Sequence, residues 1–138
     1  MDNLVKVYSK IDNENIAVFN YKIPLDTKAV VIETDNRYGI FVDYKRIESF
    51  DEEFIIMSHE YGHCKSGATH KVGSNHDIIE KHEYRANRQS ILAFLPFHKL
   101  KKVISEGYTQ TYEIAEYLNL PEKFVIMAIR QYKCMGKL

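Results

Sequence analysis

The feature that most constrains the fold is the segment His59-Glu60-Tyr61-Gly62-His63, an H-E-x-x-H pattern with two histidines four residues apart. Residues at this spacing lie one turn apart on the same face of an α-helix, so both imidazoles can face one cation only if the segment is helical. Glu60 is rotated by about 100° from His59 on such a helix. We therefore expect its carboxylate beside a metal ion rather than on it, where a general base for a bound water must lie.

The residues around this pattern predict a helix from Phe50 to about Lys65. Ser49 or Asp51 can serve as its N-cap, and Gly67 follows its end. The chain beyond this helix is predicted to be helical as well, with a loop at residues 64–76 and helices at residues 77–95, 97–107, 110–118 and 121–133.

The chain ahead of residue 50 has shorter patterns that are typical of strands. Residues 29–32 and 39–42 predict two strands, and Asp35 and Asn36 between them favour a turn, so we expect a β-hairpin. A short amphipathic helix at residues 4–11 and a small strand at residues 16–19 are expected before it. The order of elements therefore predicts an α+β fold with a small antiparallel sheet in front and helices behind.

Composition limits the classes of protein to consider. The chain has 138 residues with 45% hydrophobic side chains, enough for a core without disulfides, and its 19 basic and 19 acidic side chains cancel. This balance argues against a dedicated nucleic-acid binder. No apolar stretch approaches the roughly 20 residues that cross a bilayer. No signal-like segment is visible, so we expect a cytoplasmic protein in which Cys64 and Cys134 are free thiols.

A catalytic zinc site usually has three protein ligands and one open position, so the two histidines require a third ligand. Glu83 is the first candidate, because it falls on the small and apolar face of the second long helix. A carboxylate buried there without a partner would cost several kcal/mol, roughly. Glu80 and His82 are the second and third candidates. The alternative explanation for Glu83 is an ion pair with an arginine such as Arg37 or Arg46.

This set of donors predicts metal-assisted hydrolysis. Zinc lowers the pKa of a coordinated water to about 7, and Glu60 is placed to take its proton and later to return it to a leaving amine. Asn87, one turn after Glu83, could orient a metal ligand through a hydrogen bond. Tyr61, Tyr84 and Tyr108 are candidate oxyanion donors by residue type alone. Hydrolysis of a peptide bond is the reaction that fits these residues best.

The H-E-x-x-H segment, the pattern Glu83-x-x-Ala86-Asn87 that begins twenty residues after His63, and the helical tail together resemble the ImmA/IrrE-like metallopeptidases. The resemblance covers nearly the whole chain and is closest to compact members carried by phages and conjugative elements. It implies a zincin-like core, here residues 1–98. It also implies that His59, His63 and Glu83 bind the metal, that Glu60 is the catalytic carboxylate, and that the substrate is a helix-turn-helix repressor.

Two further segments receive a role in this interpretation. In zincin-like folds an edge strand lies above the metal, and residues 39–42 are expected to pair there with an extended substrate. Residues 99–138 are expected to form a helical tail packed on the core, in which residues 112–132 read like a helix-turn-helix. The second helix of that pair is mostly apolar, which favours packing, or docking of the repressor, over reading of base edges.

Two functions of other classes stay open at this point. One is a non-hydrolytic anti-repressor or toxin–antitoxin component that binds its partner and uses the metal only structurally. The other is a DNA-binding module, which predicts a steep dependence of duplex affinity on salt. The tail has seven basic and four acidic side chains, a local charge of +3 against −3 for residues 1–98. This asymmetry is small and favours orientation of a charged protein partner.

Overall fold

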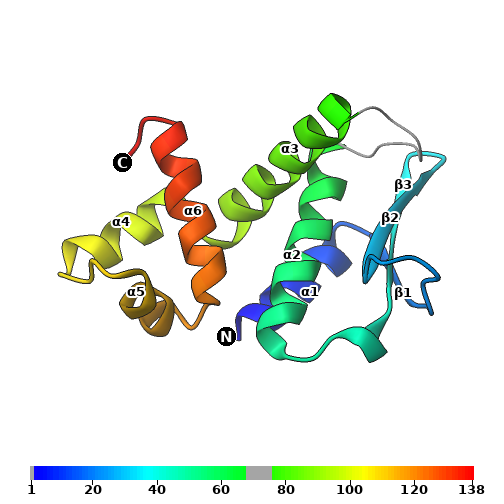
Figure 1. The fold of residues 1–138 in the computed structure, drawn as a ribbon, viewed down its shortest axis with the longest axis horizontal. Coiled ribbons are helices and arrows are strands. Elements are labelled where there is room, and N and C mark those ends of the chain that lie inside the picture. Colours follow the sequence, from blue (N-terminus) through cyan, green and yellow to red (C-terminus); the bar gives the residue numbers. More distant parts are fainter. Residues whose placement is uncertain (1, 68–75) are drawn as a thin grey trace.

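The elements follow one another in the order that the sequence predicts, helix and small sheet first and helices afterwards (Figure 1). The computed structural model describes residues 2–67 and 76–138. Its elements are α1 (Asn3–Asn13), β1 (Ala17–Asn20), β2 (Ala29–Thr34), β3 (Arg37–Val42), the short 3-10 helix η1 (Tyr44–Arg46), α2 (Phe50–Ser66), α3 (His76–Phe94), α4 (Phe97–Ser105), α5 (Thr111–Leu118) and α6 (Glu122–Cys134). The predicted α+β class is confirmed.

The sheet has three strands in the order β1-β3-β2. The predicted hairpin is confirmed, since β2 and β3 pair in antiparallel fashion, and Asp35 and Asn36 at its turn have φ angles of 49° and 64°. Aspartate and asparagine tolerate this left-handed conformation, which two-residue hairpin turns require. The prediction of an antiparallel sheet is wrong for β1, which runs parallel to β3. The sheet is mixed because residues 21–28 carry the chain past β3 to the far edge before the hairpin turns back.

The place of β3 in this order corrects a second expectation. Residues 39–42 were expected to form an edge strand that pairs with substrate, but β3 is the central strand and both of its sides are paired. The edge strand that packs against α2 is β2. A peptide that added to the sheet beside α2 would therefore have to pair with β2.

Local capping explains where α2 begins and ends. The hydroxyl of Ser49 accepts a hydrogen bond from the backbone N–H of Glu52 at 3.0 Å, so Ser49 is the N-cap. Gly67 ends the helix with φ of 66°, a left-handed conformation that glycine adopts without strain. The predicted loop begins too early, because residues 64–66 belong to α2. Residues 68–75 of that predicted loop lie outside the described residues, and α3 begins at His76.

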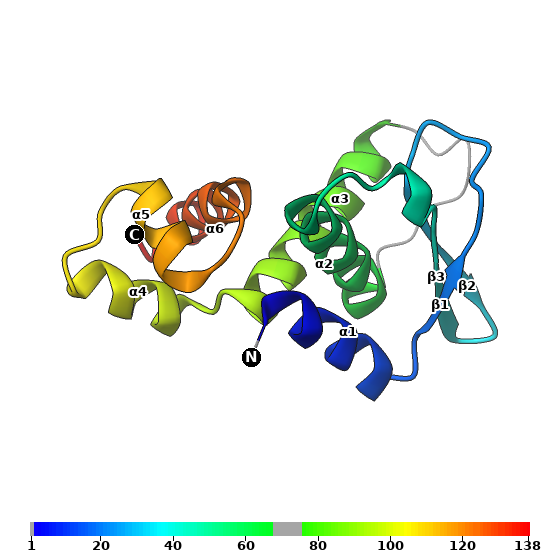
Figure 2. The ribbon, with the colours of Figure 1, turned by 90° about the horizontal axis from the view of Figure 1, so that it is seen from below.

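Helices α4, α5 and α6 gather at the C-terminal end of α3, on the opposite side from the sheet (Figure 2). The phenol of Tyr132 on α6 donates to the backbone carbonyl of Leu95 at 2.7 Å and joins the tail to the end of α3. Asn119, with φ of 54°, forms the turn between α5 and α6. Phe124, Val125 and several other apolar residues of α6 are buried. Packing is thus the main role of α6.

The expected docking surface on α6 is not supported by its burial. Among the described residues, none of the exposed large apolar side chains belongs to α6. Within the same residues, no helix combines the length and the apolar character needed to cross a membrane.

Candidate metal centre

Helices α2 and α3 make direct backbone contact at Gly62 and Ala86. A Cβ atom built on Gly62 would lie 2.0 Å from the carbonyl oxygen of Ala86, so only glycine fits at this position. Gly62 stands immediately before His63, and Ala86 stands one turn after Glu83. The crossing therefore places the Glu83 side of α3 opposite the histidine side of α2.

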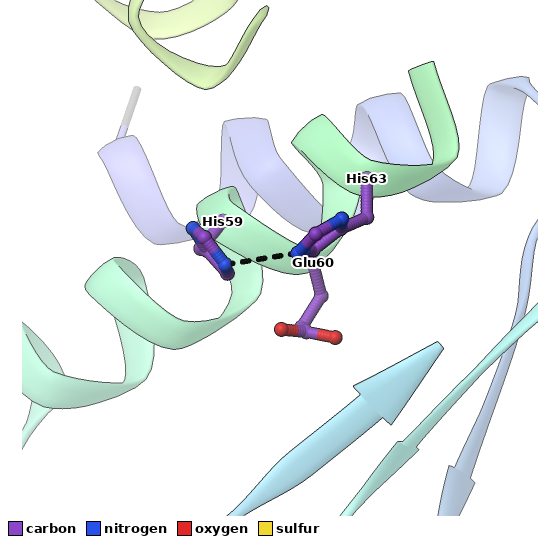
Figure 3. Close-up of side chains that lie close together, drawn as sticks. All are labelled: His59, Glu60 and His63. Atoms are coloured by element: carbon purple, nitrogen blue, oxygen red, sulfur yellow. Dashed lines mark hydrogen bonds between the residues drawn. The ribbon is translucent and has the colours of Figure 1, made fainter. Parts of the chain in front are cut away.

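The two histidines and Glu83 meet at this crossing. The Nε2 atoms of His59 and His63 lie 3.1 Å apart, as the dashed line in Figure 3 marks, and the planes of the two rings meet at 87°. One carboxylate oxygen of Glu83 lies 2.7 Å from Nε2 of His59, and the other lies 3.1 Å from Nε2 of His63. Three donor groups from two helices thus converge on one point.

These distances fit a zinc ion without a change of fold. Ligands held at 2.0 to 2.1 Å in tetrahedral geometry are separated from one another by about 3.3 Å. The two Nε2 atoms are 3.1 Å apart and Glu83 lies 2.7 and 3.1 Å from them, so the three groups need to move apart by only a few tenths of an ångström. Two imidazoles and a carboxylate are also the donor types that catalytic zinc sites use.

Glu60 lies beside this cluster. Its carboxylate lies within 4.8 Å of the ring nitrogens of both histidines, and its side chain leaves α2 next to theirs (Figure 3). Glu60 is a possible ligand by distance, but the oxygens of Glu83 are closer, so Glu83 fits the third position better. Only 8% of Glu60 is exposed, and this burial raises the pKa of its carboxyl group above the usual range. A carboxylate in this environment holds a proton more readily than one in water.

Asn87 fixes the orientation of one histidine. Its amide oxygen accepts a hydrogen bond from Nδ1 of His59 at 2.8 Å, so the proton of a neutral imidazole lies on Nδ1. The lone pair of Nε2 is then available to a metal ion, whereas a protonated His59 donates from Nε2 to Glu83. The predicted contact of Asn87 with a candidate metal ligand is present, and that residue is His59.

The charges of Glu83 and His59 stabilise each other. Hydrogen bonds from His59 and His63 lower the pKa of the Glu83 carboxyl group far below its usual range. Burial alone would lower the pKa of His59, but the hydrogen bond to Glu83 and the nearby carboxylates outweigh it and raise this pKa. The site therefore favours a negatively charged Glu83 opposite a positive charge.

The structure distinguishes the candidates for the third ligand. Among the described residues, Glu83 contacts both histidine Nε2 atoms, whereas the exposed Glu80 pairs with His76 at 2.9 Å. His82 is partly buried on α3, and the three distances that define the cluster do not involve it. Arg46 donates to the backbone carbonyls of residues 25–27 instead of pairing with Glu83. Glu83 is less buried than expected, because 41% of its side chain is exposed.

The three tyrosines considered as oxyanion donors have other partners. Tyr61 is hydrogen bonded to Glu14, and the hydroxyl of Tyr84 accepts a hydrogen bond from Gln131 at 3.1 Å. The ring of Tyr108 packs on Tyr117 in the tail, with 4.8 Å between the ring centroids. These contacts do not support the oxyanion role for any of the three.

Sequence reasoning missed the role of Gly62. The signal was available, since a glycine inside a strongly helical segment usually marks a close approach of another backbone. Comparison of the chain with protein-family models, with curated proteins and with solved structures gives no significant match.

Proposed function

We propose that this chain is a zinc-dependent peptidase that hydrolyses a peptide bond in a regulatory protein, with a helix-turn-helix repressor of a phage or mobile element as the substrate class. His59, His63 and Glu83 would hold the zinc, and Glu60 would be the catalytic carboxylate. One observation carries the proposal: three donor groups lie 2.7 to 3.1 Å apart, with a separate buried carboxylate beside them.

When bound, zinc supplies Lewis-acid chemistry, which acidifies water and polarises a carbonyl group. Glu60 supplies the proton transfers. Its carboxylate accepts a proton from the attacking water and delivers it to the nitrogen of the departing amine. Burial suits Glu60 to both steps, because it raises the pKa of the carboxyl group and brings it closer to the working pH. Asn87 keeps the His59 ring in the tautomer that can bind metal.

The alternative, a non-hydrolytic partner-binding protein with a structural metal, fits the site less well. Structural zinc sites are closed by four protein ligands, most often with several cysteines. Here the cluster offers two histidines and Glu83, and Cys64 is no member of it. A site with three ligands and a neighbouring base is the arrangement that catalysis requires.

The test is the substitution Glu60→Gln, which keeps the shape of the side chain and removes its basicity. We expect the zinc-loaded wild-type protein to cleave a helix-turn-helix regulator encoded beside its gene. We expect the variant to bind one zinc per chain and to cleave at least about a hundredfold more slowly, the lower part of the range for loss of a general base. Fragments are measured by mass spectrometry and zinc by atomic absorption.

Two ligand variants serve as controls. His59→Ala and Glu83→Ala should each lower the zinc content, whereas Glu80→Ala should not, because Glu80 pairs with His76. Full zinc retention by Glu83→Ala would move the third ligand to another residue. Cleavage at the wild-type rate by Glu60→Gln would refute the proposed role of Glu60. Zinc binding without cleavage by the wild-type protein would favour the structural-metal alternative.

A further inference from the structure

A groove of about 810 Å³ lies between α1, the first turns of α2 and the connection of α5 to α6. These three segments meet near the N-terminus in Figure 1. The groove is separate from the candidate metal site, because it is not lined by His59, Glu60, His63 or Glu83. Its apolar lining includes Leu4 and Val5 from α1, Phe50 and Phe54 from α2, and Pro121 before α6.

The walls of the groove are held in place by hydrogen bonds. The side-chain amide of Asn3 donates to the backbone carbonyls of Leu118 at 2.9 Å and Asn119 at 2.7 Å, which joins α1 to the end of α5. The phenol of Tyr8 donates to the carboxylate of Glu53 at 2.6 Å, which joins α1 to α2. A partner would therefore meet a surface that is already formed, so little ordering free energy is lost on binding.

Apolar side chains stand exposed at the rim of the groove. Phe50, the first residue of α2, is 81% exposed, and Val5 on α1 is 50% exposed. The other faces of both helices are buried. Phe54, one turn after Phe50, is 3% exposed and belongs to the core. Exposed aromatic and aliphatic groups above an apolar floor are typical of surfaces that bind another protein.

The charge of the groove has one sign. Asp2, Asp12 and Asp51 line it, and no lysine or arginine among the described residues does. Within residues 2–67 and 76–138, none of these aspartates takes part in an ion pair. Asp2 also caps α1, because its carboxylate accepts a hydrogen bond from the backbone N–H of Leu4 at 2.7 Å. A cationic partner is favoured by this field.

The length of the groove indicates the form of that partner. Its lining residues on α1 run from Asp2 to Asp12, about 15 Å at the rise of an α-helix, which matches roughly three turns. This span exceeds the reach of a small cation, and none of the three described strands lines the groove to pair with an extended peptide. A helix with an apolar stripe fits such a groove by placing residues i, i+3, i+4 and i+7 against its floor.

We propose that this groove binds an amphipathic helix of a partner protein, in which lysine or arginine side chains flank the apolar stripe. The apolar residues pack between Val5, Phe50 and Pro121, and the basic residues face the three aspartates. This inference goes beyond the proposed peptidase function and does not depend on it, because binding here uses no residue of the metal cluster.

The test uses the full-length, zinc-loaded protein and a panel of fluorescein-labelled helical peptides of about 18 residues, roughly five turns. Each peptide has leucine or phenylalanine at i, i+3, i+4 and i+7 with flanking lysine and arginine, in different registers. Each also has a counterpart in which glutamate replaces the basic residues. Fluorescence anisotropy should show saturable binding of basic peptides, with affinity at least about tenfold weaker for the acidic counterparts.

Variants locate the binding surface. Phe50→Ala should weaken binding at least about tenfold, and so should the pair Asp12→Lys and Asp51→Lys, because these residues line the groove. The three side chains are exposed, so the fold is kept. The matched controls, Leu25→Ala and Asp26→Lys, alter exposed residues that do not line the groove and should leave the affinity unchanged.

Several results would overturn the inference. They are absence of saturable binding throughout the basic panel, equal binding of the acidic counterparts, or wild-type affinity of Phe50→Ala. A dimer that sedimentation detects and Phe50→Ala abolishes would assign the groove to a second copy of the chain instead. Glu60→Gln should bind the peptides as the wild-type protein does, so loss of cleavage and loss of docking are distinguishable.

Discussion

Substitution of Gly62 by alanine tests whether the spacing of α2 and α3 builds the metal site. The added Cβ would lie 2.0 Å from the Ala86 carbonyl oxygen and 2.8 Å from the carbonyl carbon. Real contacts of this type are not shorter than 3.0 Å, so one helix must retreat by at least about 1 Å. The obstacle is backbone, which cannot rotate away as a side chain would.

The expected magnitude follows from these distances. Overpacking of this kind costs about 1 to 3 kcal/mol, and the higher helix propensity of alanine offsets about 1 kcal/mol. We expect a net loss of about 0 to 2 kcal/mol in the free energy of unfolding and a fall in Tm of at most several degrees. Zinc–ligand distances tolerate changes of only about 0.2 Å. A retreat of Glu83 should therefore weaken zinc binding by about ten- to a hundredfold.

Zinc affinity is measured by competition with a chromophoric chelator, and Tm is measured in the presence and absence of EDTA. The control is Gly39→Ala on β3, where the new Cβ would lie 3.3 Å from a side-chain atom of Phe19 that can shift. Gly39→Ala should keep the wild-type zinc affinity. Wild-type zinc affinity in Gly62→Ala would refute the reasoning, whether or not its Tm falls, because the site would then not depend on the helix spacing.

Three further predictions concern single side chains. Asn87→Ala should weaken zinc binding about ten- to a hundredfold, as measured by the same competition, because it removes the acceptor that orients His59; unchanged affinity would contradict this. Burial would lower the pKa of His59, but Glu83 outweighs this effect and raises the pKa above its usual value of about 6.5. As the pH falls, protons should therefore begin to compete with zinc for His59 while the pH is still above about 6.5. In the metal-free protein, the His59–Glu83 pair stabilises the fold fully below about pH 6.5, and this stabilisation is lost as the pH rises through the folded-state pKa of His59. Equal Tm values at pH 6 and pH 9 would contradict this prediction. Burial raises the pKa of the Cys64 thiol to about 12, so iodoacetamide at pH 8 should label the exposed Cys134 and spare Cys64 until urea unfolds the chain, as mass spectrometry will show.

The helices and most of the side-chain cluster at the candidate metal site could be predicted from sequence because their signals are local. Ser49 caps α2 through a contact three residues away, and His59 and His63 share a face because of helix geometry alone. The position of Glu83 needed one more step, the choice of the inner face of α3. The contact of Glu83 with α2 was predicted correctly, but its burial was overestimated. A helical wheel gives the direction of a side chain and does not show how deeply neighbouring elements cover it.

The strand order could not be predicted in the same way, because pairing joins residues that are distant in sequence. One signal for the central position of β3 was nevertheless present. Residues 40–42 are apolar on both faces of the strand, and Ile40 and Val42 are fully buried, as expected of a strand with neighbours on both sides. The last residues of β2, Glu33 and Thr34, are polar and exposed, as edges commonly are.

Burial across the candidate metal site indicates from which side a substrate would reach it. The exposed fraction of the side chain increases from 8% for His63 to 24% for His59 and 41% for Glu83. The α2 side of the site is therefore closed by packing, whereas the side of Glu83 is open to solvent. Because Glu60 belongs to the closed side, its carboxylate keeps its raised pKa while the open side stays accessible to a substrate. A structural metal would need no such opening, so the gradient of exposure favours the catalytic interpretation on grounds separate from the number of ligands.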